Sequence, residues 1–116
     1  SFARSVQAGQ LVELASITSV ATTLGAKRVA AQALEVERTF DVSPHVVSDA
    51  AAIAACLRFA DDHRLVVEPA CGAALALLYE QTPKLREFDD LVVIVCGGAG
   101  VSYGELLALA QRLTRS

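Results

Sequence analysis

The residues best suited to chemistry are a cysteine and three glycines at positions 96–100 (CGGAG), which follow an apolar run. A strand, a glycine-rich turn and a helix start can cradle phosphate through free backbone N–H groups. The spacing matches neither GxGxxG nor GxxxxGK[ST], so by itself it favours a tight turn that needs glycine for backbone room. Cys96 could also act as a nucleophile with His45 or His63, but both histidines flank polar turns, which is more typical of surface positions.

Three other polar residues or patterns invite a catalytic interpretation. GxSxG at positions 100–104 would make Ser102 a hydrolase nucleophile, but neither an aspartate nor a histidine follows it, as that fold requires. Glu68 precedes a proline and is expected at the N-terminus of the next helix, where the macrodipole favours a carboxylate. The two lysines, Lys27 and Lys84, lie in polar settings, and neither resembles a desolvated Schiff-base lysine.

The elements that must position these residues alternate between strands and helices. Short strands are predicted at 28–31, 46–47, 65–67 and 91–96. Helices are predicted at 1–9, 17–24, 31–38, 49–60, 70–80 and 103–114. The alternation predicts an α/β fold, with a mostly parallel sheet and helices on both of its faces. Ligands bind beyond the carboxyl ends of such strands, so the 91–96 strand would point Cys96 and the glycines at a ligand crevice.

Two of these elements carry specific expectations about burial. The unbroken β-branched run at 91–96 is typical of a parallel strand that is covered on both faces. The helix at 49–60, capped by Ser48 or Asp49, should bury a face that includes Ala50, Ile53, Ala54 and Leu57, with Cys56 and Ala60 beside it. That list follows from helical spacing alone.

Composition narrows the class of protein. The chain has 116 residues, 53% of them hydrophobic, and a formal net charge of −3 without a basic cluster, so nucleic acid and anionic membranes are not indicated as partners. The longest uncharged run, 91–104, has 14 residues, fewer than the roughly 20 that cross a bilayer. Three widely spaced cysteines without CxxC spacing argue against zinc or disulfides and favour the cytoplasm. The absence of methionine and the apolar start predict further residues upstream.

Several segments, taken in order, resemble the L-serine/L-threonine dehydratases, a branch of the tryptophan-synthase-like, fold-type-II pyridoxal-phosphate enzymes. The resemblance covers essentially the whole chain, and VEPACGAALA at 67–76 and LVVIVCGG at 91–98 are its specific parts. The other matching segments are ITSVA at 17–21, LG at 24–25, AQAL at 31–34 and VSD at 47–49. The resemblance implies that residues 1–116 are part of the cofactor-binding large domain.

The resemblance also implies a reaction and a cofactor site. Such enzymes eliminate water from L-serine or L-threonine to give pyruvate or 2-oxobutanoate and ammonia, with pyridoxal 5′-phosphate as the electron sink. Cys96 matches the position that faces the pyridine nitrogen, and Gly97 and Gly98 would let the backbone approach the ring. No catalytic residue is assigned here, because the Schiff-base lysine and the substrate and phosphate loops belong to upstream sequence. The chain alone is therefore expected to be inactive.

By the same resemblance, Ser1, Leu24 and Ala26 match a monovalent-cation site. K⁺ prefers hard oxygen donors such as backbone carbonyls, although Leu24 to Ala26 could equally be an ordinary helix end. Thr23 falls near the cofactor region and receives no role. The resemblance further implies a cytoplasmic homodimer that acts on an amino acid. The N-terminal part of the same enzyme, which precedes these residues, is expected to complete it.

Two other interpretations stay open at this stage. The chain could be a non-catalytic paralogue or scaffold that binds a partner chain through its apolar face. It could also belong to another fold-type-II lyase such as a threonine synthase, although a cysteine at position 96, rather than serine or threonine, argues mildly against that.

Overall fold

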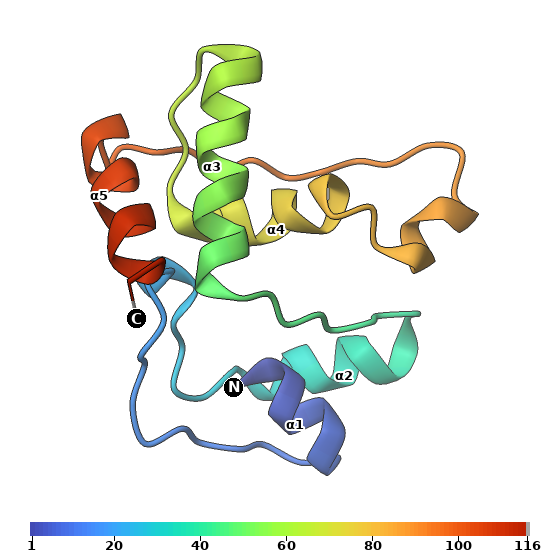
Figure 1. Cartoon of the computed structure of the whole chain (residues 1–116). Coiled ribbons are helices and arrows are strands. Elements are labelled where there is room, and N and C mark those ends of the chain that lie inside the picture. Colours follow the sequence, from blue (N-terminus) through green and yellow to red (C-terminus); the bar gives the residue numbers. More distant parts are fainter. Residues whose placement is uncertain (116) are drawn as a thin grey trace. The chain divides into compact units, whose positions relative to one another are not determined.

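The computed structural model describes residues 1–115 and consists of helices joined by extended segments (Figure 1). The elements in chain order are α1 (Phe2–Ala8), η1 (Thr22–Leu24), α2 (Ala31–Thr39), α3 (Asp49–His63), α4 (Pro69–Tyr79), η2 (Pro83–Glu87) and α5 (Tyr103–Leu113). The chain forms two compact units, of which the N-terminal unit is Ser1–Val46 and the C-terminal unit begins at Val47. None of the helices within residues 1–115 is both long and apolar enough to cross a bilayer.

In the N-terminal unit, α1 packs against α2, and α1 ends where the sequence predicts. Gly9 takes a left-handed conformation with φ 66°, which costs glycine little, and its N–H bonds back to the last turn of α1. Ser5 is completely buried in α1 and accepts a hydrogen bond from the Val12 backbone N–H at 2.9 Å. That bond ties the following segment to the helix.

The predicted helix at 17–24 is wrong, because only the short η1 forms there. Isoleucine, valine and threonine dominate the stretch, and β-branched residues lose side-chain freedom in a helix. In addition, the Ser19 hydroxyl accepts a hydrogen bond from the Ala21 N–H at 3.1 Å, which offers the backbone a non-helical alternative. Gly25 does close the element, since its N–H donates to the Thr22 carbonyl at 2.9 Å. The predicted strand at 28–31 is also absent, and Ala31 begins α2.

The C-terminal unit is organised around α3, whose start is the predicted one. The Ser48 hydroxyl accepts a hydrogen bond from the Ala51 N–H at 3.1 Å and caps the helix. The helix runs three residues beyond the predicted end at 60. It ends at His63, because Arg64 adopts a left-handed conformation with φ 60°.

The face that α3 buries differs from the predicted one. Ile53, Cys56 and Ala60 are buried as expected, but Ala50 and Ala54 are exposed. Ala52 and Ala55 are buried in their place. The reason is α4, which crosses α3 (Figure 1) and approaches its backbone closely at Gly72, where a Cβ would overlap the Ala52 carbonyl oxygen.

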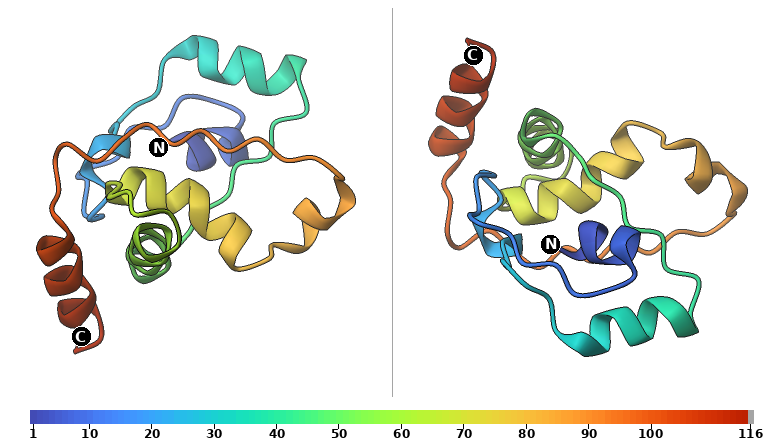
Figure 2. Two further views of the ribbon diagram at one scale, coloured as in Figure 1. Left: turned by 90° about the horizontal axis from the view of Figure 1, so that it is seen from above. Right: turned by 90° about the horizontal axis from the view of Figure 1, so that it is seen from below.

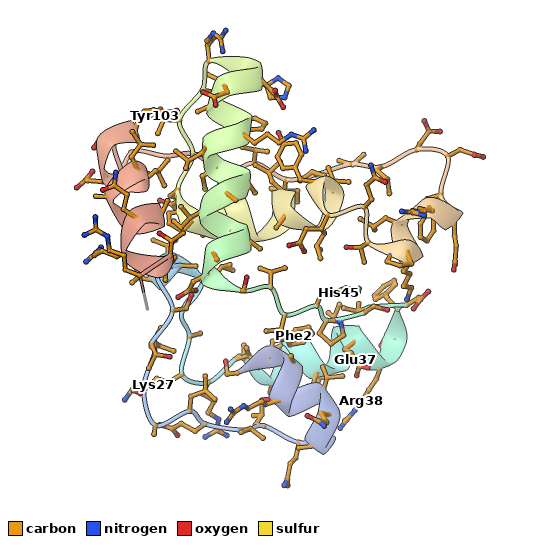
Figure 3. The ribbon with its side chains drawn as sticks, in the orientation of Figure 1. Phe2, Lys27, Glu37, Arg38, His45 and Tyr103 are labelled. Carbon is orange, nitrogen blue, oxygen red and sulfur yellow. The ribbon has the colours of Figure 1, made fainter. Side chains whose placement is uncertain are left out.

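Helix α5 also packs against α3, and its Leu106 is fully buried. Ser102 and Glu105 form a capping box at its N-terminus, in which the serine hydroxyl accepts from the Glu105 N–H and the carboxylate accepts from the Ser102 N–H at 2.7 Å. Next to the cap, the Tyr103 hydroxyl donates to the Asp61 carboxylate at 3.2 Å and so links α5 to the end of α3 (Figure 3).

The predicted α/β sheet is not formed within residues 1–115, where no strand ladder is present. Residues 65–67 and 91–96 are extended, as predicted, but unpaired along most of their length. The 91–96 segment is also not covered on both faces, since Val92 is 94% and Ile94 76% exposed. Helix α4 lies between α3 and this segment (Figure 2). A strand is stabilised by a neighbouring strand that pairs with its N–H and C=O groups, and the described residues supply no such neighbour.

Candidate functional site

One sulfur atom of α4 makes several hydrogen bonds to the turn that follows the 91–96 segment. The Cys71 Sγ accepts hydrogen bonds from the backbone N–H groups of Cys96 and Gly97, at 3.2 and 3.4 Å. The same thiol donates to the Gly97 carbonyl at 3.3 Å. Cys71 is buried in the first turn of α4, whereas Cys96 is exposed. The arrangement therefore fixes the backbone of the turn and leaves the Cys96 side chain accessible.

The end of the other extended segment is tied to the same place through Glu68. The Glu68 N–H donates to the Gly97 carbonyl at 3.0 Å. Its own carbonyl accepts from the Cys71 and Gly72 N–H groups, at 2.9 and 3.1 Å, and from the Cys56 thiol at 3.3 Å. Glu68 thus occupies the N-cap position of α4, where the sequence places it, although its side chain makes no capping bond.

Cys56 contributes to this arrangement as a protonated thiol. Burial in the core raises the pKa of Cys56 to about 11, and the nearby Glu68 carboxylate acts in the same direction. The group therefore stays S–H at neutral pH and can donate to the Glu68 carbonyl. All three cysteines are free, and Cys96 alone among them is exposed.

The two glycines of the turn are needed for different reasons. Gly97 has φ 144°, a conformation that side chains rarely permit, and no atom lies within 4 Å of the position that a Cβ would take. Space is therefore open on that side of the turn, as an approaching ligand requires. Gly98 instead packs internally, because a Cβ there would overlap the Val66 carbonyl. Because Gly98 has no side chain, the 65–67 segment can pack directly against the turn that follows 91–96.

The serine and the two histidines that the sequence offers as catalytic candidates are not arranged for catalysis. The Ser102 hydroxyl donates to the Glu105 carboxylate at 2.8 Å within the helix cap, so it is not paired with a histidine as a hydrolase serine would be. The His63 ring stacks on Phe59, with 4.5 Å between the ring centroids, and within residues 1–115 it makes no hydrogen bond to Cys96. His45 lies in the segment that follows α2, in the N-terminal unit (Figure 3).

Neither lysine is placed like a desolvated amine. Lys27 projects from the loop between η1 and α2 (Figure 3), and both Lys27 and Lys84 are exposed. Schiff-base lysines owe their reactivity to burial or to a neighbouring cation. No catalytic residue is therefore assigned within the described chain.

The N-terminal unit brings the three predicted cation-site residues together locally. The Ser1 hydroxyl donates to the Ala26 carbonyl at 2.5 Å. Two residues earlier, the Leu24 carbonyl accepts from the Ala26 N–H at 3.0 Å. The three residues thus offer one hydroxyl and two carbonyl oxygens. Within residues 1–115, no three His, Cys, Asp or Glu side chains gather as a metal site.

Residues 1–97 match the family model described as pyridoxal-phosphate dependent enzyme. The chain belongs to this family. The bovine L-serine dehydratase/L-threonine deaminase is 49% identical over 121 residues, which cover 97% of this chain and 37% of the relative. A human serine dehydratase-like protein is 43% identical, with 97% of this chain and 36% of the relative covered. The resemblance stated from the sequence is thereby confirmed.

A solved structure of related sequence supports the same placement. A fungal L-serine ammonia-lyase from Rhizomucor miehei superposes with a TM-score of 0.87 at 36% identity, covering 96% of this chain and 37% of that one. The chain thus spans a little over a third of the length of the relatives that it matches.

The residues at the turn suit the family's cofactor. An exposed thiol is a weak donor that can hydrogen-bond an unprotonated ring nitrogen. The open side of Gly97 leaves room that a Cβ would fill. The contribution of Cys71 is not evident from spacing. Its signal in the sequence is a polarizable side chain in the first turn of an apolar helix, directly after a strand-like segment.

Proposed function

We propose that this chain is part of an enzyme that eliminates water from L-serine or L-threonine, yielding pyruvate or 2-oxobutanoate and ammonia. The observation that carries the proposal is the accessible Cys96 thiol on a turn whose backbone is fixed, in a chain 49% identical to a dehydratase. The rest of the enzyme is expected to supply the reactive lysine, since neither lysine described here is buried.

Cys96, Gly97 and Gly98 each have a different role in this proposal. Pyridoxal phosphate, when bound, supplies the electron sink for the charge left when the α-proton departs. The Cys96 thiol donates a weak hydrogen bond to the ring nitrogen and leaves it unprotonated. Gly97 keeps the approach to the ring open, and Gly98 holds the turn against the Val66 backbone.

The exposed 91–96 segment supports a further part of the proposal, a parallel sheet in the complete enzyme. Val92 and Ile94 are too apolar and too exposed for a solvent-facing segment. Backbone pairing with strands from outside residues 1–115 would bury both side chains and satisfy their N–H and C=O groups. The α/β fold predicted from the sequence would then arise in the whole protein.

Replacing Cys96 with alanine in the complete polypeptide tests the proposal. The loss of one hydrogen bond, worth about 1.4 kcal/mol, should weaken pyridoxal-phosphate binding about tenfold. Fluorescence titration of the cofactor-free protein measures this effect. Cys96→Ser retains a donor and is the matched control, so it should bind within about threefold of the parent protein. Equal binding by Cys96→Ala would contradict the assigned contact.

We also propose that Ser1, Leu24 and Ala26 help to bind K⁺. The support is their local oxygen cluster, in which the Ser1 hydroxyl and the Ala26 carbonyl lie 2.5 Å apart. In the complete polypeptide, Ser1→Ala removes one oxygen ligand of K⁺ and should raise the K⁺ concentration for half-maximal activity about tenfold. The maximal rate at saturating K⁺ should stay near that of the parent. Titration of serine turnover with KCl, and with NaCl as comparison, measures this. Unchanged K⁺ dependence would remove Ser1 from the site.

Two expectations from the family resemblance stay predictions: a homodimeric assembly and a cytoplasmic location.

A further inference from the structure

We propose that Cys71 is a positioning residue for the cofactor-facing turn, holding Cys96 at a fixed place relative to α4. The inference rests on the proposed function, because it concerns the group that Cys96 faces. Cys71 does not act on the substrate. Its sulfur instead accepts hydrogen bonds from two adjacent backbone N–H groups, and its S–H donates a hydrogen bond to the Gly97 carbonyl.

A thiol is well suited to this position. Its sulfur is large and polarizable, and it accepts the two N–H groups at 3.2 and 3.4 Å, distances that are long for oxygen but ordinary for sulfur. A serine hydroxyl would sit nearer its own Cβ, because a C–O bond is shorter than a C–S bond. It could therefore not keep both contacts at good geometry. Cys71 as a whole residue is only 2% exposed, so water cannot readily replace its thiol.

The support behind Cys71 is rigid. The N-cap residue of its helix is Glu68, whose carbonyl accepts a hydrogen bond from the Cys56 thiol of α3. One residue beyond Cys71, Gly72 packs directly on the α3 backbone at Ala52. The two helices therefore form one packed element, and Cys71 transmits its position to the turn. This is a side-chain anchor in addition to the backbone bond from Glu68 to Gly97.

Loss of the anchor should free the turn. With Cys71→Ala, the N–H groups of Cys96 and Gly97 lose their acceptor, and Gly97 can leave its φ of 144° for other glycine conformations at little cost. The Cys96 thiol would then sample several positions. A cofactor that requires one of them binds more weakly in proportion to its population.

Hydrogen exchange on the cofactor-free complete polypeptide tests the anchor without any reference to activity. In Cys71→Ala, the amides of Cys96 and Gly97 should exchange about tenfold faster than in the parent, the change expected for roughly 1.4 kcal/mol of lost protection. Cys71→Ser should restore part of the protection. Ser5→Ala is the matched control, since it likewise removes a buried side-chain acceptor of a backbone N–H, and that N–H belongs to Val12 rather than to the turn.

Pyridoxal-phosphate titration of the same variants forms the second arm. We expect Cys71→Ala to bind about tenfold more weakly than Ser5→Ala, with Cys71→Ser between the two. Equal exchange at Cys96 and Gly97 in the Cys71→Ala and Ser5→Ala variants overturns the inference. Faster exchange with unchanged affinity overturns the link to the cofactor. If the parent protein binds no pyridoxal phosphate, the proposed function fails, and the exchange arm still decides whether Cys71 fixes the turn.

Discussion

Gly72→Ala is expected to destabilise the protein by about 3 kcal/mol, the upper end of the usual cost of overpacking. The added methyl group would overlap the Ala52 carbonyl oxygen and the Cys56 sulfur. A backbone carbonyl inside α3 cannot move away as a flexible side chain could, so the two helices must separate. Their separation would also loosen Cys71, which follows Pro69 and Ala70 in the same helix turn.

Urea unfolding followed by circular dichroism measures this loss, and Gly104→Ala is the matched control. No atom lies within 4 Å of a Cβ at Gly104, which is in the first turn of α5. Alanine is the better helix former, so this variant should gain up to about 1 kcal/mol. The same substitution would thus have opposite signs at two helical glycines. A loss below about 1 kcal/mol at Gly72 would show that α3 and α4 do not meet as closely as described.

The second large effect is on serine dehydration, which should be absent in the 116-residue chain alone and present once the rest of the enzyme is supplied. Residues 1–116 with added pyridoxal phosphate should not dehydrate L-serine, because neither Lys27 nor Lys84 is desolvated. A chimera should behave differently. If the matching 37% of the bovine dehydratase is replaced by this chain, the relative supplies the remaining residues, and serine turnover should return. Pyruvate formation measured with a coupled lactate dehydrogenase assay reports both results.

One variant of the chimera serves as a control, and two outcomes would contradict the prediction. A chimera that carries Cys96→Ala should fold equally well, since Cys96 is exposed, but should bind the cofactor more weakly. Turnover by the 116 residues alone would overturn the assignment of the lysine to another part of the enzyme. A folded chimera that binds the cofactor but turns over no serine would favour a non-catalytic paralogue.

Local sequence determined the elements that are stabilised by nearby residues. Ser48 caps α3 with its own side chain, and Pro69 begins α4 at a position that tolerates a missing N–H. Gly9 ends α1 because its left-handed conformation is inexpensive. The extended character of 65–67 and 91–96 also followed from their β-branched residues. In each case the decisive contacts lie within a few positions along the chain.

Tertiary structure decided what depends on distant partners. The spacing of alanines could not reveal that α3 buries Ala52 and Ala55, because the close approach of Gly72 selects that face. The unpaired state of 91–96 depends on strands that residues 1–115 do not contain, and no local propensity replaces a missing neighbour. The role of Cys71 likewise appears only when position 71 meets position 96, because a hydrogen bond across 25 residues leaves no periodic signal in the sequence.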